Sequence, residues 1–165
     1  MDDENFGNFF DAGDFGDDDE NEESWKPVKI HGKALFRKAV EILNLTESLC
    51  DVLPEDVNAE TSKQMMLQNA MVVPSKIKGA MAVDEIYSLV MESAVLIKIN
   101  MMELKNHLWA TSNIFDLEEK YPDVLRHEIE EFKKIFIQWV TSFNKQDDLP
   151  DEWHLFNDPS SFPAV

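Results

Sequence analysis

The sequence predicts an all-α protein, namely an up-down-up-down antiparallel four-helix bundle with acidic, disordered N- and C-terminal tails. Four stretches repeat apolar residues at steps of three and four positions, which is the helical period. The links between these stretches are short, and short links make consecutive helices antiparallel neighbours. No alternating apolar and polar run bounded by turn residues indicates a strand.

The first predicted helix runs from Gly32 to Val52 and ends before Pro54, because proline cannot continue a helix. It has two apolar rows, one beginning at Leu35 and the other at Phe36. Together they are wider than the single stripe that one core requires. We therefore expect one row to face the core and the other to contact another subunit.

The second predicted helix runs from Asn58 to Ala82, with Asn58 or Thr61 as its N-cap. Pro74 lies inside it and lacks the backbone N–H that a helix uses, so we expect a kink just before it. Gly79 is expected either to weaken the end of this helix or to allow a close approach of another helix.

The third predicted helix, from Val83 to Ala110, is the central one, since it contains neither Gly nor Pro. One apolar row repeats at helical spacing: Ile86, Val90, Ala94, Ile97, Met101, Leu104 and Leu108. A second row begins at Tyr87, Met91 and Val95. The second row again predicts a subunit contact.

The fourth predicted helix begins near Leu117 or near Asp123, after Pro122, and ends at about Phe143. Its apolar residues form a single stripe: Leu125, Ile129, Phe132, Phe136, Trp139 and Phe143. The opposite face is polar, so this helix is amphipathic in the ordinary way.

The predicted domains are an acidic, aromatic-containing tail over residues 1–26, the bundle over 27–145, and an acidic tail rich in proline and aromatic residues over 146–165. The first tail holds eleven acidic residues and one lysine, more than half of the formal net charge of −18. Segments that mix acids with rings can dock by placing a ring in a pocket and carboxylates on a basic rim. The tail is therefore either a solvated charged segment or a docking peptide for a partner with a basic surface. Its candidate partner-docking residues are aromatic: Phe6, Phe9, Phe10, Phe15 and Trp25.

The acidic charge limits the classes of partner, since it repels both phosphate and anionic lipid. No run of about 18 apolar residues without a charge suggests a membrane span, and the N-terminus lacks the features of a signal peptide. Cys50 is the only cysteine, which excludes an intrachain disulfide, and we interpret it as a buried thiol. These features predict a soluble cytoplasmic protein that binds no membrane.

A basic cluster at the start of the first helix is the one place where the chain could meet phosphate. We take it together with the lysines that follow Pro74 as candidate residues for binding nucleic acid or the protein's own acidic tail: Lys29, Lys33, Arg37, Lys38, Lys76 and Lys78. Lysines solvated on a helix face are the plainer interpretation.

The segment from Leu67 to Gly79, LQNAMVVPSKIKG, resembles the four-helix-bundle family encoded in intervening sequences of 23S ribosomal RNA genes. Accessory variability proteins of diversity-generating retroelements share that bundle. The matching positions are Ala70, Val73, Pro74, Ser75 and Ile77. The stretches Lys33–Thr46 and Met102–Leu108 are similar in style to the family's first and third helices. The resemblance covers about residues 30–143.

The resemblance implies a four-helix bundle, assembly into a pentameric ring and a role with nucleic acid. Gln68 and Asn69 stand where the family tends to have a basic pair, so the nucleic-acid role transfers less well than the fold. The second apolar rows give an independent reason to expect a homo-oligomer. The candidate interface residues are Phe36, Val40, Leu43, Tyr87, Met91 and Val95.

No motif in the sequence indicates a particular chemical reaction. There is no Gly-rich phosphate loop and no nucleophile motif, so we predict no catalytic residues and no enzyme. The pairs Glu103/His107 and His127/Glu131 have spacing suited to a metal site in a bundle. The helical period, however, turns His127 and Glu131 towards water and places Glu103 and His107 at the flank of the core. We therefore predict neither a metal nor another cofactor.

The predicted function is that of a non-catalytic, oligomeric scaffold or adaptor that binds a protein partner, with the acidic tail as docking peptide. The alternative is an RNA- or DNA-associated accessory protein in which the acidic tail mimics nucleic acid and covers the basic cluster.

Overall fold

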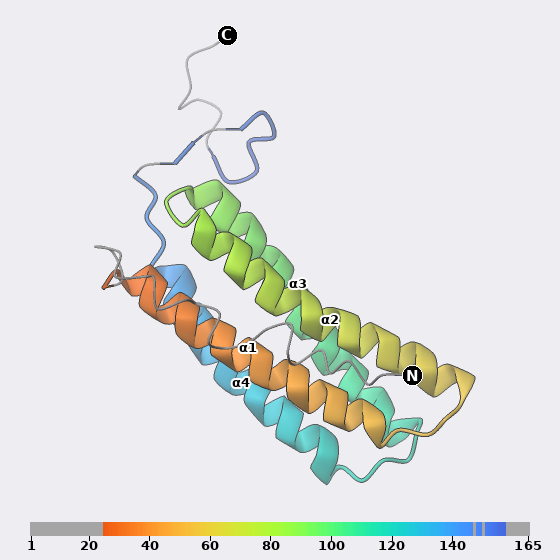
Figure 1. Cartoon of the computed structure of the whole chain (residues 1–165). Helices are drawn as coiled ribbons and strands as arrows, with labels where there is room; N and C mark the ends of the chain where they lie inside the picture. The colour runs from red at the N-terminus through yellow and green to blue at the C-terminus, as the bar shows by residue number, and fades with distance from the viewer. Residues whose placement is uncertain (1–24, 147, 150, 158–165) are drawn as a thin grey trace, which may run out of the picture.

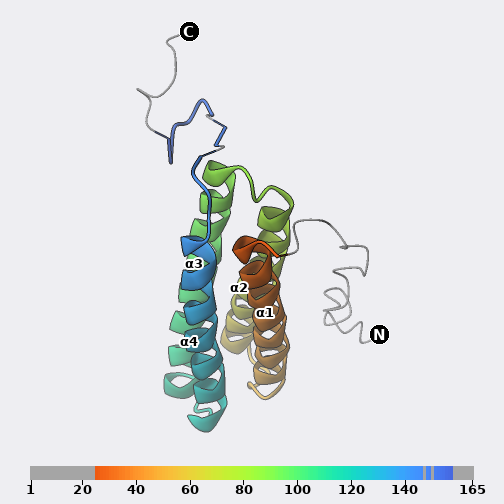
Figure 2. The same cartoon turned by 90° about the vertical axis from the view of Figure 1, so that its left-hand side faces the viewer.

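The computed structural model describes residues 25–146, 148–149 and 151–157, and these form the predicted four-helix bundle (Figure 1). The helices are α1 (Pro27–Asp51), α2 (Val57–Ala82), α3 (Tyr87–Asn113) and α4 (Lys120–Thr141). Each contacts the next in the chain, and α4 closes the square by contacting α1. Seen from the side, α3 and α4 lie next to each other, opposite α1 and α2 (Figure 2).

The core runs the length of the bundle and uses the predicted apolar positions of all four helices. Its largest fully buried side chains include Trp139, Phe36, Leu35, Ile42, Met66, Ile77, Ile97 and Leu104. Both apolar rows of α1 are buried in it. A helix at the corner of a square has two neighbours, so a wide apolar surface is covered within one chain.

The helix ends differ from the prediction where local chemistry overrides the apolar period. Helix α1 begins at Pro27 rather than Gly32, because proline's fixed φ suits the first turn of a helix. The N-cap of α2 is Asp56, not Asn58 or Thr61: its carboxylate accepts hydrogen bonds from the backbone N–H groups of Asn58 and Ala59, at 2.8 and 2.9 Å.

Helix α3 begins at Tyr87 rather than Val83, and a residue far along the chain caps it. Asp148 Oδ1 accepts hydrogen bonds from the backbone N–H and the hydroxyl of Ser88, at 2.9 and 3.0 Å. Asn157 Nδ2 donates to the other oxygen of this carboxylate. Part of the predicted C-terminal tail is thus attached to the N-terminal end of α3.

Gly79 does not mark a close approach between helices, because a Cβ built there meets nothing within 4 Å. The close approach is at Gly32, where a Cβ would lie 2.9 Å from Met81 Sδ. We therefore expect Gly79→Ala to raise the free energy of unfolding by roughly 0.5–1 kcal/mol, the difference in helix propensity. Urea denaturation measures this change, and a loss of stability would show that the site lacks the open space described.

Cys50 is buried, as predicted, and desolvation raises the pKa of its thiol from its ordinary value of 9.0 to about 12. The folded state therefore keeps a proton that the unfolded state releases, so stability falls as the pH rises from 9 towards 12. We expect Cys50→Ala to lose less stability than the parent chain across this range. Equal slopes of unfolding free energy against pH would contradict the burial of the thiol.

Candidate functional site

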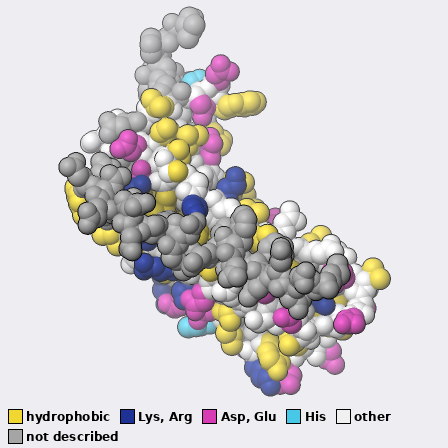
Figure 3. Space-filling view, in the orientation of Figure 1, with side chains coloured by type: hydrophobic (Ala, Val, Ile, Leu, Met, Phe, Trp, Pro, Cys, Tyr) yellow, Lys and Arg dark blue, Asp and Glu magenta, His cyan; other side chains and the backbone are white. Residues whose placement is uncertain are grey.

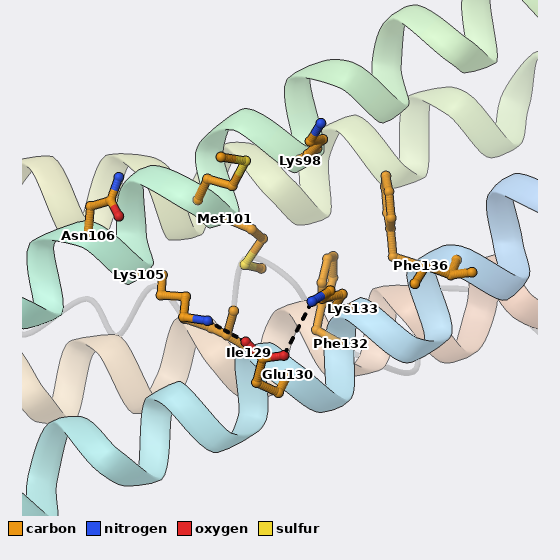
Figure 4. A pocket seen from close by; sticks show the side chains of 11 residues that line it. Lys98, Met101, Lys105, Asn106, Ile129, Glu130, Phe132, Lys133 and Phe136 are labelled. Carbon is orange, nitrogen blue, oxygen red and sulfur yellow. Dashed lines mark hydrogen bonds and ion pairs between the residues drawn. The ribbon is translucent and has the colours of Figure 1, made fainter.

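A groove with a largely apolar lining lies between α3 and α4 (Figure 4). It lies between the two adjacent helices that contact each other least. Its volume is about 550 Å³. From α3 it is lined by Lys98, Met101, Met102, Lys105 and Asn106, and from α4 by Ile129, Glu130, Phe132, Lys133, Phe136 and Ile137.

The floor of the groove is apolar and held from beneath by stacked rings. Met101, Ile129 and Phe132 are buried, and Phe136 is half-buried above them. The Phe132 and Phe136 rings stack with centroids 6.2 Å apart. The centroid of the Phe136 ring also lies 6.1 Å from that of Trp139, and Trp139 is fully buried. The floor is therefore anchored in the core and does not depend on a bound partner.

The rim of the groove is basic, although the chain as a whole is acidic. Lys98, Lys105 and Lys133 line the groove together with a single carboxylate, Glu130. Glu130 forms ion pairs with Lys105 across the groove and with Lys133 at 3.6 Å along α4. The hydrogen bond from Lys105 lowers the pKa of Glu130. Within the described residues Lys98 has no ion-pair partner, so the rim keeps a net positive charge of two.

This arrangement suits a ligand that combines an apolar ring with carboxylates. A ring on the floor leaves water, and carboxylates at its flanks meet the lysine ammonium groups. The sequence analysis missed this site. The only signal was Lys98, Met102 and Lys105, which follow one another at helical spacing along one side of α3.

The six predicted basic residues do not form one surface. Lys29 lies against the link between α2 and α3, where it pairs with Asp84 at 3.2 Å and donates to the Met81 carbonyl. Lys38 faces α4 and pairs with Glu128 and with Glu41. Figure 3 shows the side of the molecule seen in Figure 1, and on the part of it that is not grey basic side chains lie beside acidic ones. The remaining candidates are Lys33, Arg37, Lys76 and Lys78, and their role with nucleic acid stays a prediction.

Half of the predicted oligomer interface is wrong. Phe36, Val40 and Leu43 are buried in the core of the single chain, so they are not available to another subunit. On α3, Tyr87 and Met91 are partly buried and Val95 is 39% exposed. Leu96 and Ile99 are exposed beside Val95, at 41 and 43%. An apolar surface therefore lies on α3, but not on α1.

The aromatic residues proposed for docking fall mostly outside the described chain. Phe6, Phe9, Phe10 and Phe15 precede residue 25, so their role stays a prediction. Trp25 is described, and 69% of its surface is exposed.

A second hollow, between α2 and α3, is polar. Asn69 is buried there and donates from Nδ2 to Glu103 Oε2 at 2.7 Å and to Asn100 Oδ1 at 3.3 Å. His107 lines the same hollow. Among the described residues no group of three His, Cys, Asp or Glu side chains could hold a metal ion. No helix in the described ranges has the length and apolar character needed to cross a membrane.

No protein-family model, curated protein or solved structure matches this chain. The resemblance to the intervening-sequence family therefore stays a prediction, as does the pentameric ring that it implies.

Proposed function

We propose that this protein is a non-catalytic adaptor that binds a protein partner in the groove between α3 and α4. The partner segment carries an aromatic side chain flanked by carboxylates. The observation that carries the proposal is the combination of an apolar floor with a rim of three lysines in a chain whose net charge is −18.

The two parts of the groove contribute differently to binding. Burying one aromatic side chain on the floor contributes roughly 2–3 kcal/mol. Each exposed ion pair at the rim adds at most about 1 kcal/mol and is screened by salt. We therefore expect a weak complex whose affinity falls as salt rises. The ring supplies most of the binding free energy, and the carboxylates favour aromatic segments that are acidic over those that are not.

The experiment that tests this proposal is a titration followed by fluorescence anisotropy. The probe is a short fluorescein-labelled peptide rich in aspartate with one central phenylalanine. It is added to the full chain and to a variant with Phe6, Phe9, Phe10 and Phe15 changed to Ser, so that the chain's own rings cannot compete.

Two matched peptides serve as controls, one with Ser in place of Phe and one with Asn in place of every Asp. We expect both controls to bind at least tenfold more weakly, a difference of about 1.4 kcal/mol. Equal binding of all three peptides to the Ser variant, or no binding of any of them, would refute the proposal.

We also infer that the exposed apolar residues Val95, Leu96 and Ile99 support self-association of the chain through α3. Light scattering over a dilution series tests this inference. The parent chain is expected to be larger than a monomer, and Val95→Glu/Ile99→Glu is expected to be monomeric. A monomeric parent chain at every concentration would contradict it.

A further inference from the structure

We propose that the occupant of the α3/α4 groove is the chain's own N-terminal segment, residues 1–24. This inference rests on the proposed function, because it requires the groove to bind acidic segments that carry rings. The structure describes the chain from Trp25 onward, so the composition, length and attachment point of the segment carry the proposal.

The composition of the segment is complementary to the groove. Residues 1–24 contain eleven acidic residues and no Lys or Arg, with Phe6, Phe9, Phe10 and Phe15 among them. The groove offers an apolar floor for a ring, and its rim has two positive charges in excess. Opposite charge brings the two together, and burial of a ring holds them.

Two of the basic residues of α1, Lys29 and Lys38, provide a poorer match. Lys29 and Lys38 already pair with Asp84 and Glu128, both carboxylates of the bundle. The hydrogen bonds that Lys38 donates to Glu128 and Glu41 raise its pKa. An incoming carboxylate would have to displace them. The groove combines both requirements in one place.

The attachment point and length of the segment allow it to reach the groove. Helix α1 begins at the end of the bundle where α4 ends, and the Lys38–Glu128 pair fixes their antiparallel register (Figure 1). The groove residue Ile137 is four residues before the end of α4, so it lies only about 6 Å along the axis from that end. The roughly ten residues from Phe15 to Trp25 span up to about 33 Å when extended.

That reach exceeds the diameter of a helix, about 10–12 Å, so the chain can cross α4 and place Phe15 on the floor of its own groove. The other three phenylalanines, which are farther along the chain from Trp25, can reach the groove of the same chain or of a second copy. The occupant is the same segment in both arrangements.

The test uses the full chain with a nitroxide attached to a cysteine introduced by Ala12→Cys. Cys50 is buried and the pKa of its thiol is about 12, so the new cysteine is the reactive one. Broadening of methionine and isoleucine methyl signals then reports which surface lies near residue 12. We expect the strongest broadening at Met102 and Ile137, with little at Ile114 at the far end of the bundle.

Two variants give matched comparisons for this measurement. Lys98→Glu/Lys133→Glu is expected to reduce the broadening at the groove at least fivefold, whereas Lys76→Glu/Lys134→Glu, which makes the same change in net charge, is expected to leave it unchanged. Stronger broadening at Met71, on α2, than at Met102 would overturn the inference, and so would uniformly weak broadening. Mixing isotope-labelled chains without nitroxide with unlabelled chains that carry it shows whether the segment enters the groove of its own chain or that of a second copy. Either result supports the N-terminal segment as the occupant.

Failure of this inference can be told apart from failure of the proposed function. If the Ser variant binds the synthetic peptide but the nitroxide leaves the groove signals sharp, the groove is a binding site and its occupant is another protein. If the segment does occupy the groove, the parent chain should bind the synthetic peptide roughly tenfold more weakly than the Ser variant, because a tethered competitor acts at millimolar effective concentration. Equal affinities would count against the inference.

Discussion

Lys98→Glu/Lys133→Glu should weaken binding of the acidic phenylalanine peptide by about tenfold to a hundredfold. The double change reverses two of the three basic charges on the rim of the α3/α4 groove and leaves its floor intact. Carboxylates that met an ammonium group would then meet a like charge, and two such reversals cost roughly 1.5–3 kcal/mol when partly screened. Fluorescence anisotropy at low and at physiological salt measures the loss, which should shrink as salt rises.

Lys76→Glu/Lys134→Glu is the control for this result, because it makes the same change in net charge elsewhere on the bundle. Lys134 adjoins Lys133 on α4 and pairs with Glu131, as Lys133 pairs with Glu130. Both double variants therefore break one exposed ion pair on α4. Equal weakening by the two would mean that the peptide responds to overall charge and that the groove is not its binding site.

Trp139→Ala should lower the free energy of unfolding by about 3–5 kcal/mol, the range for removing a buried aromatic side chain. Trp139 is fully buried and meets Phe143 edge-on, with centroids 4.7 Å apart, as well as Phe136. Protein interiors are closely packed, so the surrounding side chains relax only partly into a cavity of that size. Since Phe136 lines the groove, the same change should also weaken peptide binding.

Trp153→Ala is the matched control for stability. Trp153 is 88% exposed, so the same change of residue type there should alter the free energy of unfolding by less than about 0.5 kcal/mol. Urea denaturation of both variants gives the two values, provided that the unfolding free energy depends equally steeply on urea concentration in both. A loss below 1 kcal/mol for Trp139→Ala would contradict the buried aromatic row on which the groove floor stands.

Trp139→Phe keeps an aromatic ring at this position but removes the indole N–H group. In the described part of the chain Trp139 Nε1 is buried and has no acceptor. A buried donor without a partner is costly, so its removal offsets part of the lost volume. We expect this variant to keep most of the stability that the alanine variant loses.

The helical period in the sequence was sufficient to predict the fold, because each core position depends on neighbours three and four residues away. The helix ends were predicted less well. Asp148 caps α3 from sixty residues along the chain, at Ser88, and no local pattern could indicate that contact. Pro27 was a local signal for the start of α1 that the prediction did not use.

The second apolar row on α1 shows why a pattern within one helix does not identify what covers it. Phe36, Val40 and Leu43 were predicted to contact another subunit, but they are buried in the core of the single chain. The α3/α4 groove was hidden from the sequence for the same reason. Its depth depends on how far apart two helices lie, and that spacing is set by the packing of side chains from both.

The most direct measurement of the central claim, that the α3/α4 groove is a binding site, is photo-crosslinking with the same peptide after its phenylalanine is replaced by benzoylphenylalanine. The benzophenone inserts readily into methionine side chains, and the bundle carries methionines on several faces. We predict that mass spectrometry of the crosslinked full chain finds the peptide on Met101 and Met102. Crosslinks mainly to Met65 or Met71, which lie on α2, or an even spread over all methionines, would contradict the claim.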